Sequence, residues 1–247
     1  MTTKVVPGLL IASDDVGAVA QGASARMGKA IRDAIAARGT ACIALSGGES
    51  PRAAYKLLAA DEKIHWSNVN VFWVDERAAP PTDDRSNYRW AKASLLDPAK
   101  IPAANVHRMP ADAPDLDVAA QAYETLIRKV VPVDAMGVPS FDLMVLGIGE
   151  DGHTASLFPG ENTIDITDRL VTAVPAAEKR EARMTLTVPA IEHARLALVV
   201  AVGKNKRGPL ERVWQVNGDA HATPARVIRG VRGGIMWIID KAAGGLG

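Results

Sequence analysis

The chain has 247 residues, 48% of them hydrophobic and 23% charged, which excludes a disordered, collagen-like or coiled-coil protein. Its 29 Lys and Arg residues nearly balance 28 Asp and Glu residues, which excludes the strongly basic field that attracts nucleic acid or anionic lipid. Cys42 is the only cysteine, and the sequence shows neither a leader-like start nor an apolar run of membrane length. We therefore expect one cytoplasmic domain over residues 1–247, a monomer or weak homodimer, with no nucleic-acid and no membrane partner.

A long amphipathic helix is predicted near the start of the chain. Apolar or small residues recur at helical spacing from Val16 to Ile35, and Arg38-Gly39 supplies a basic last turn and a stop. The apolar run 41–45 then predicts a short strand buried on both faces. It ends at a glycine turn, so a strand, a turn and a helix form the first unit.

The same alternation continues along the chain. Apolar runs predict strands over residues 69–74, 141–149, 196–202 and 235–240, and helical patterns lie at about 86–96, 115–130 and 204–216. Alternating strands and helices imply an α/β fold, a mostly parallel sheet with helices on both faces. Two strand-like segments within 160–193, LVTAV and RMTLTV, interrupt the alternation and predict a hairpin, a small β excursion from the main sheet.

In open parallel sheets, ligands bind outside the carboxyl ends of the strands, so polar residues after each apolar run are the first candidates. Ser46, Gly47 and Gly48 lie between a strand and a helix opened by Pro51. Glycine backbone N–H groups and a helix N-terminus can hold a phosphate, although the Walker pattern is absent. A tight connection without a ligand is the alternative interpretation.

A charged cluster follows the next strand. Asp75, Glu76 and Arg77 put two carboxylates and a guanidinium at a strand end, a combination suited to hydroxyl recognition and to oxyanion stabilisation. A solvated surface cluster is the alternative.

The segment GIGEDGHTASLFPG at 147–160 is the most specific in the chain. Gly147, Gly149 and Gly152 satisfy G-x-G-x-x-G, a pattern typical of dinucleotide binding. That pattern should open a long helix, yet Pro159-Gly160 follows within a few residues and no acidic strand end follows at the expected distance. We therefore reject the dinucleotide interpretation and expect no cofactor.

His153, beside Asp151 in this segment, is the candidate general base, because an ordinary histidine titrates near pH 6.5, at about the pH where water must be activated. A purely structural histidine is the alternative. The other four lie in surface-like surroundings without catalytic neighbours: His65, His107, His193 and His221. We expect no metal, because the sequence contains no HExxH, no CxxC and no closely spaced ligand set.

Basic residues elsewhere provide candidate phosphate contacts. Arg183 begins the strand-like RMTLTVP, and three more follow Gly203 at the start of a helix: Lys204, Lys206 and Arg207. A basic surface turn is the alternative interpretation. We interpret another group, spaced by three, as a solvated helical face: Arg226, Arg229 and Arg232.

Taken together, the motifs resemble those of the 6-phosphogluconolactonases, within the wider group that includes glucosamine-6-phosphate deaminases. The resemblance spans nearly the whole chain and rests on ALSGGESP, FWVDER with SNY, LGIGEDGHTASLFPG, RMTLTVP and VGKNK, in the family's order. It implies a three-layer α/β/α sandwich with a Rossmann-like sheet, and metal-free hydrolysis of a sugar-phosphate lactone, 6-phosphogluconolactone, in the oxidative pentose phosphate pathway.

Two alternatives to the lactonase remain. The deaminase relatives follow their Gly-His turn with Phe-Asn-Glu-Pro, whereas Phe158 stands at the glutamate position here, so ammonia release should be lost. A non-catalytic sugar-phosphate sensor could discard the base, yet His153 and Asp151 are retained. Within the resemblance, spacing from Gly203 assigns the phosphate contact to Lys206, with Lys204 as a possible substitute.

The mechanism expected for a lactonase needs a base, a positioned water and oxyanion stabilisation. We assign His153 as the base, Asp151 as the residue that orients it, and Arg77 to the oxyanion. The phosphate is assigned to the turn 46–48, Arg183 and Lys206. Asp75 would contact sugar hydroxyls or orient Arg77.

Overall fold

The computed structural model describes residues 3–178 and 180–246, and its centre is a parallel sheet. Within the described residues six strands pair in the order β1-β9-β8-β5-β2-β3, and every registered pair is parallel. Their bounds are Leu9–Ser13 (β1), Ala41–Leu45 (β2), Val69–Trp73 (β3), Leu143–Leu146 (β5), Leu196–Ala201 (β8) and Gly234–Asp240 (β9). The predicted strands are confirmed, with ends shifted by a few residues.

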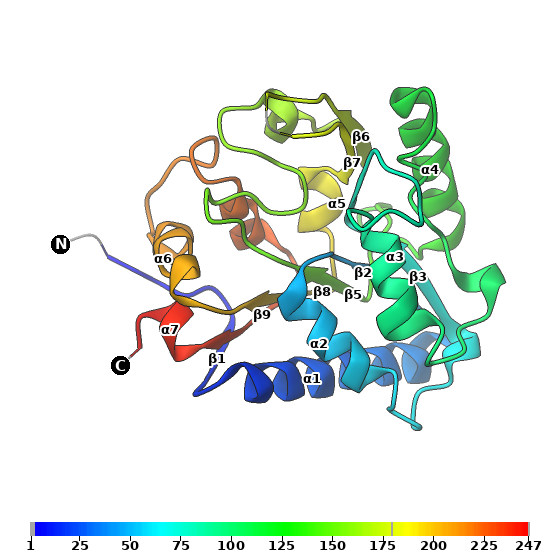
Figure 1. Cartoon of the computed structure of the whole chain (residues 1–247), viewed down its shortest axis with the longest axis horizontal. Helices are drawn as coiled ribbons and strands as arrows, with labels where there is room; N and C mark the ends of the chain where they lie inside the picture. Colours follow the sequence, from blue (N-terminus) through cyan, green and yellow to red (C-terminus); the bar gives the residue numbers. More distant parts are fainter. Residues whose placement is uncertain (1–2, 179, 247) are drawn as a thin grey trace.

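Helices cover both faces of this sheet, as predicted (Figure 1). In Figure 1, α1 and α2 run below the sheet, and α5 lies above it. The bounds are Val16–Arg38 (α1), Glu49–Leu58 (α2), Asn87–Ala91 (α3), Leu116–Val130 (α4), Val188–Glu192 (α5), Arg207–Trp214 (α6) and Lys241–Gly244 (α7). None of the helices in the described part of the chain combines the length and apolar character needed to cross a membrane.

Helix α1 shows why the sequence pattern was informative. The Asp15 side chain accepts a hydrogen bond from the N–H of Ala18 at 2.8 Å, which satisfies a free donor of the first turn. Gly39 ends the helix in the left-handed conformation, with φ of 77°. Met27 and Ile31 lie on the buried face, against the sheet. Capping and amphipathic spacing therefore agree on the same helix.

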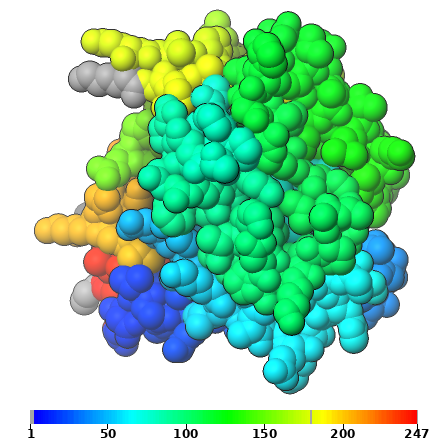
Figure 2. Space-filling view, turned by 45° about the vertical axis from the view of Figure 1, so that its right-hand side comes forward, coloured from blue at the N-terminus to red at the C-terminus, as the bar shows by residue number. Residues whose placement is uncertain are grey.

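The remaining helical segments depart modestly from the prediction. The pattern at 86–96 forms α3 followed by a π-helical turn, Lys92–Leu96, and the pattern at 204–216 forms a 3-10 turn, Lys204–Lys206, followed by α6. Figure 2 shows the surface that α3 and α4 build with their connecting loops on one side of the molecule. The short 3-10 segments are Trp66–Asn68, Ala103–Asn105, Asn162–Asp165 and Pro224–Gly230.

A second, antiparallel sheet carries the predicted hairpin. Val171–Val174 (β6) pairs with Arg183–Leu186 (β7), which confirms the hairpin, and β7 also pairs with Asp75–Arg77 (β4). The run predicted as one strand over 69–74 therefore splits. The chain leaves the main sheet at Val74, whose N–H donates to Leu45 O and whose carbonyl accepts from the N–H of Leu186, each at 2.8 or 2.9 Å.

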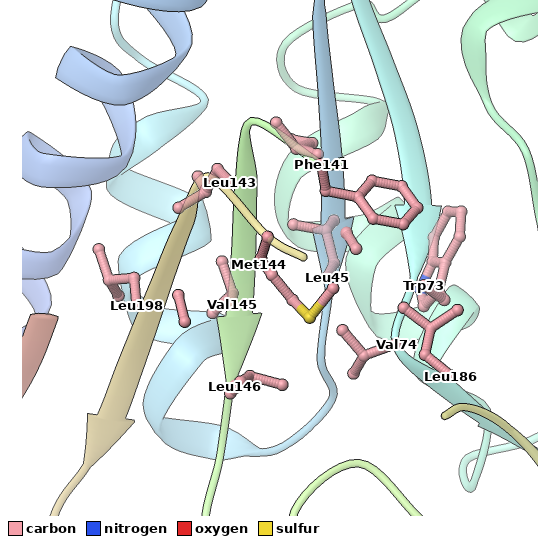
Figure 3. Packing of buried hydrophobic residues seen from close by; sticks show 14 of the residues in the cluster. Leu45, Trp73, Val74, Phe141, Leu143, Met144, Val145, Leu146, Leu186 and Leu198 are labelled. Carbon is pink, nitrogen blue, oxygen red and sulfur yellow. The ribbon is translucent and has the colours of Figure 1, made fainter. Parts of the chain in front are cut away.

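The hydrophobic core is continuous across both sheets. Figure 3 shows Trp73, Val74 and Leu186 close together where the two sheets meet, with Leu45 and Met144 beside them. All five side chains are fully buried. The core therefore fixes the position of β4 relative to the ends of the main strands, while the expectation of a single domain stays a prediction.

One strand, β1, was not predicted, and two interpretations of single side chains were wrong. His193 is not at the surface but buried, with Nδ1 2.5 Å from a carboxylate oxygen of Asp134. Arg226 is not a solvated side chain, because its guanidinium donates to carbonyl oxygens at the end of α6, at 2.6 Å for Arg212 and 2.9 Å for Gln215.

Candidate functional site

A polar cavity of about 240 Å³ lies at the carboxyl ends of the central strands. The predicted site residues that line it come from five separate segments: Ser46, Gly47, Gly48, Asp75, Arg77, His153, Arg183 and Lys206. Asp151 does not line the cavity, and instead lies behind His153. The site is thus built where the strand ends meet, as expected for an open parallel sheet.

The turn 46–48 leads from β2 directly into α2. Gly48 precedes the helix with φ of +99°, a conformation that side chains disfavour, and no side chain caps the helix N-terminus. A Cβ atom on Gly47 would lie only 1.9 Å from Oδ1 of Asn87, so this position requires glycine. Uncapped N–H groups at the start of a ten-residue helix face the cavity and favour an anion.

Asp75 is held rigidly at the edge of the cavity. One carboxylate oxygen accepts a hydrogen bond from Ser156 Oγ at 2.7 Å, and the other accepts from Asn87 Nδ2 at 3.1 Å. The Arg183 guanidinium lies 3.7 Å from the same carboxylate. Asp75 is therefore paired with Arg183, whereas the sequence had linked it to Arg77.

Two guanidinium groups converge on the cavity, because Arg77 in β4 pairs directly with Arg183 in β7. Burial lowers the pKa of Arg183. The Asp75 carboxylate raises this pKa, and the Arg77 charge lowers it. The Nε atoms of both arginines are buried and make no hydrogen bond within the described residues. Buried donors without acceptors are costly. The guanidinium groups of Arg77 and Arg183 therefore favour the binding of an anionic ligand in the cavity.

Glu76 does not share the cavity with its neighbours. Successive side chains of a strand point to opposite faces, and the Glu76 carboxylate accepts hydrogen bonds from the N–H groups of Arg77, Asn87 and Tyr88 and from Ser86 Oγ, at 2.8 to 2.9 Å. Burial raises the pKa of Glu76 despite these bonds. The expectation that both carboxylates recognise hydroxyl groups is therefore wrong for Glu76. Its carboxylate instead holds the N-terminus of α3.

His153 and Asp151 form a pair in the loop after β5. One Asp151 carboxylate oxygen lies 2.6 Å from His153 Nδ1 and also accepts from the His153 backbone N–H at 3.0 Å. Burial raises the pKa of Asp151, but these hydrogen bonds outweigh it and lower the pKa to about 2. Asp151 thus stays ionised at neutral pH and engages Nδ1, which leaves Nε2 as the free ring nitrogen.

Gly149 leaves room for the side chains of His153 and Asp151. A Cβ atom on Gly149 would lie 2.1 Å from His153 Nδ1 and 2.5 Å from the Asp151 carboxylate, so only glycine leaves room. The loop continues into the turn Thr154–Leu157 and not into a long helix. Gly149, the second glycine of the G-x-G-x-x-G pattern, therefore has a local packing reason that involves no dinucleotide.

Several features of the site were not predicted from sequence. Asn87 and Ser156 both hold Asp75, although neither residue was assigned a role in the site from the sequence. Phe158 packs against His153, with ring centroids 4.7 Å apart, and the Arg180 guanidinium lies 3.9 Å from the centroid of the Phe158 ring. The contact of Ser156 with Asp75 spans 81 positions, so spacing alone gave no signal for it.

The two candidate lysines are separated by the fold. Lys206 lines the cavity, whereas Lys204 lines a separate depression with Arg207 and Lys241. The geometry therefore favours Lys206 as the cation that meets an anionic ligand.

The chain was compared with known proteins. The family described as glucosamine-6-phosphate isomerases/6-phosphogluconolactonase matches residues 14–237. A 6-phosphogluconolactonase of Synechocystis sp. is 39% identical over 214 residues, which cover 87% of this chain and 88% of that protein. A 6-phosphogluconolactonase of Streptomyces coelicolor is 37% identical over 95% of this chain and 92% of its own length. The solved 6-phosphogluconolactonase structure from Trypanosoma brucei matches with a TM-score of 0.84 at 25% identity, covering 98% of each chain.

Proposed function

Because the chain belongs to the family of glucosamine-6-phosphate isomerases and 6-phosphogluconolactonases, we propose that it hydrolyses 6-phosphogluconolactone with His153 as the general base. The observation that supports this proposal is the arrangement of one cavity. A histidine paired with an ionised carboxylate lies in the same cavity as an uncapped helix N-terminus, two arginines and a lysine. The histidine suits water activation, and the helix N-terminus with the three cationic side chains suits a phosphate.

The hydrolysis needs little more than these groups, because a δ-lactone is an activated ester. His153 Nε2 takes a proton from water as the water oxygen attacks C1, and the carbonyl oxygen becomes an oxyanion. Arg77, whose Nε has no protein acceptor in the described structure, stabilises that charge. The bond from C1 to the ring oxygen then breaks, and His153 returns the proton to the leaving oxygen. The product is 6-phosphogluconate, which would place the enzyme in the oxidative pentose phosphate pathway.

The 6-phosphate would lie beside the helix N-terminus and the cationic side chains of the cavity. N–H groups of the turn 46–48 and the start of α2, the Arg183 guanidinium and the Lys206 ammonium together supply donors and positive charge. Asp75 holds Arg183 in place, and its two carboxylate oxygens accept hydrogen bonds from Ser156 and Asn87. Binding of the phosphate would thereby align C1 with His153.

The deaminase alternative fits this site less well. Phe158 covers a face of the His153 ring, so the position that could have carried a second carboxylate presents an apolar ring instead. An apolar ring cannot accept a proton or polarise the imidazole. Ammonia release from glucosamine 6-phosphate is therefore not expected.

A direct assay tests the proposal. Purified protein is mixed with freshly generated 6-phosphogluconolactone, and acid release is followed above the spontaneous rate at the same pH. Faster acid release proportional to protein concentration would support the lactonase. Tight binding of 6-phosphogluconate without any turnover would instead support a sugar-phosphate sensor.

Removing a phosphate contact should weaken substrate binding. Replacing Arg183 or Lys206 by methionine should chiefly raise KM, by about 10- to 150-fold for the loss of one charged hydrogen bond. Lys204→Met is the matched control, because Lys204 lies outside the cavity and KM should barely change. Gluconolactone without a phosphate should be a poor substrate. Equal kcat/KM for the two lactones would show that these groups do not hold the phosphate.

Chelation should leave the activity intact. Among residues 3–178 and 180–246, no three His, Cys, Asp or Glu side chains gather closely enough to hold a metal ion. We expect the rate to be unchanged after exhaustive dialysis against EDTA. Loss of activity that zinc or magnesium restores would require a different mechanism.

A further inference from the structure

Arg212, in α6, braces the loop that carries His153 from outside the cavity. Its Nη2 donates a hydrogen bond to the backbone carbonyl of Asp151 at 3.1 Å, and its Nε donates to Thr223 Oγ1 at 3.2 Å. The side chain does not line the cavity and forms no ion pair with any described residue. One contact therefore joins the helix to the backbone of the loop, and the other joins it to the Thr223 side chain.

The neighbouring backbone is fixed from the same side. The N–H of Ala225 donates to the carbonyl of Gly152 at 2.9 Å. Gly152 itself has φ of +100°, and a Cβ atom there would lie 3.0 Å from Thr223 Cγ2 and 3.3 Å from Arg212 Nη2. The peptide between Asp151 and Gly152 is thus packed closely against Arg212 and Thr223.

Glycine allows this peptide many conformations, and hydrogen bonds at both its N–H and its carbonyl restrict it to one. If it rotated, the Asp151 side chain would move with it, and the 2.6 Å contact with His153 Nδ1 would be lost. Within the loop, the Asp151 carboxylate accepts from the His153 N–H at 3.0 Å and the Gly152 N–H donates to Gly149 O at 3.0 Å. The Asp151 carbonyl, on the opposite side of that peptide, is held from outside the loop. Arg212 is the described side chain that donates to that carbonyl.

We infer that Arg212 is a positioning residue that holds the Asp151 carbonyl and thereby keeps the Asp151 carboxylate on His153. The inference rests on the proposed function of His153 as the base. Helix α6 begins directly after Lys206, so the same two-turn helix carries the brace and adjoins the proposed phosphate contact. Misplacement of a catalytic group by about 1 Å can cost about 100-fold in rate, so the brace has a kinetic consequence.

The test compares Arg212→Met with Arg212→Lys and with Arg207→Met. Arg207 lies on the same helix and its exposed side chain pairs with Glu211 at 3.3 Å, which makes it a matched control. We expect Arg212→Met to lower kcat about 10- to 100-fold with KM changed less than about threefold. Arg212→Lys, which keeps one donor, should recover part of the loss, and Arg207→Met should behave as the wild type.

Two further measurements separate positioning from a structural role. The acid limb of kcat/KM against pH should shift toward lower pH in Arg212→Met, because a displaced Asp151 no longer stabilises the protonated imidazole. The other charged groups that line the cavity, Asp75, Arg77, Arg183, Lys206 and Glu49, are unchanged in this variant. Thr223→Val removes only the partner of Nε, and should give a smaller loss of kcat in the same direction.

The His153 ring signal in an NMR pH titration, identified by its loss in His153→Asn, reports on the contact without any turnover. If the wild type hydrolyses no lactone, the proposed function fails, while a changed His153 titration in Arg212→Met still supports the brace. If the wild type is active and Arg212→Met and Thr223→Val keep wild-type kcat, pH profile and His153 titration, the brace is wrong. A lower kcat with an unchanged titration and pH profile would also overturn it. If Arg212→Met does not fold, Thr223→Val and Arg212→Lys decide by the same measurements.

Discussion

Replacing His153 by asparagine should lower kcat by about 10²- to 10⁴-fold, while the affinity for 6-phosphogluconate changes little. Asparagine keeps a polar side chain of similar reach but cannot take a proton near neutral pH. The proposed phosphate contacts, which are the turn 46–48, Arg183 and Lys206, are unchanged in this variant. Rates and product affinities of the two proteins, with spontaneous hydrolysis subtracted at every pH, provide the measurement.

His221→Asn is the matched control. The His221 side chain is exposed and pairs with Asp165 outside the cavity, so its loss should leave kcat unchanged. If folded His153→Asn retains wild-type turnover while binding 6-phosphogluconate, the water is activated elsewhere. Asp75 would then be the next residue to replace.

The pH dependence follows from the Asp151 and His153 pair. Asp151 has a pKa of about 2 and therefore remains a carboxylate across the working range. The neutral imidazole is the base, so kcat/KM should rise with pH as the imidazolium loses its proton. In Asp151→Asn the acid limb should move to lower pH, because the carboxylate that stabilises the imidazolium is gone. A pH-independent kcat/KM for the wild type would contradict a histidine base.

Replacing Asp142 by alanine should destabilise the fold by about 2 to 4 kcal/mol without lowering kcat of the folded protein. The Asp142 carboxylate is buried, accepts from the Cys42 N–H at 2.8 Å, and lies 2.5 Å from Arg38 and 3.3 Å from Arg195. These contacts lie at the amino ends of β2 and β5, at the far end of the strands from the cavity. Urea unfolding and kinetics on the same sample measure the two effects separately.

Asp168→Ala controls for the loss of a charge. Asp168 is exposed and pairs only with its neighbour Arg169 in the described structure, so the free energy of unfolding should be nearly unchanged. A comparable effect in Asp142→Ala would show that the buried hydrogen bonds around Asp142 contribute little.

The sequence predicted which polar residues share the cavity because one rule covers most of them. Ser46, Asp75 and His153 each follow an apolar run, and the carboxyl ends of parallel strands share one edge of a sheet. The same apolar runs predicted the main strands, since strands buried on both faces are continuously apolar. Local patterns were sufficient wherever the deciding contacts were local.

The remainder depends on contacts between distant segments. The separation of β4 from β3 depends on the pairing of Val74 with both Leu45 and Leu186, which no periodicity reveals. The burial of His193 depends on Asp134, 59 positions away. β1 was missed because its five residues are mostly only partly buried, so its pattern is weak.

The pairing of β1 with β9 has a kinetic consequence. The first strand of the chain lies next to the last, and the Trp237 indole N–H donates to Pro7 O across 230 sequence positions. During synthesis β1 therefore waits without its partner until residues 234–240 have emerged, and loop closure over such a distance slows folding. Linking the two ends and opening the chain at a surface loop would make β9 and β1 sequence neighbours. Such a circular permutant should form this edge of the sheet faster than the natural order does.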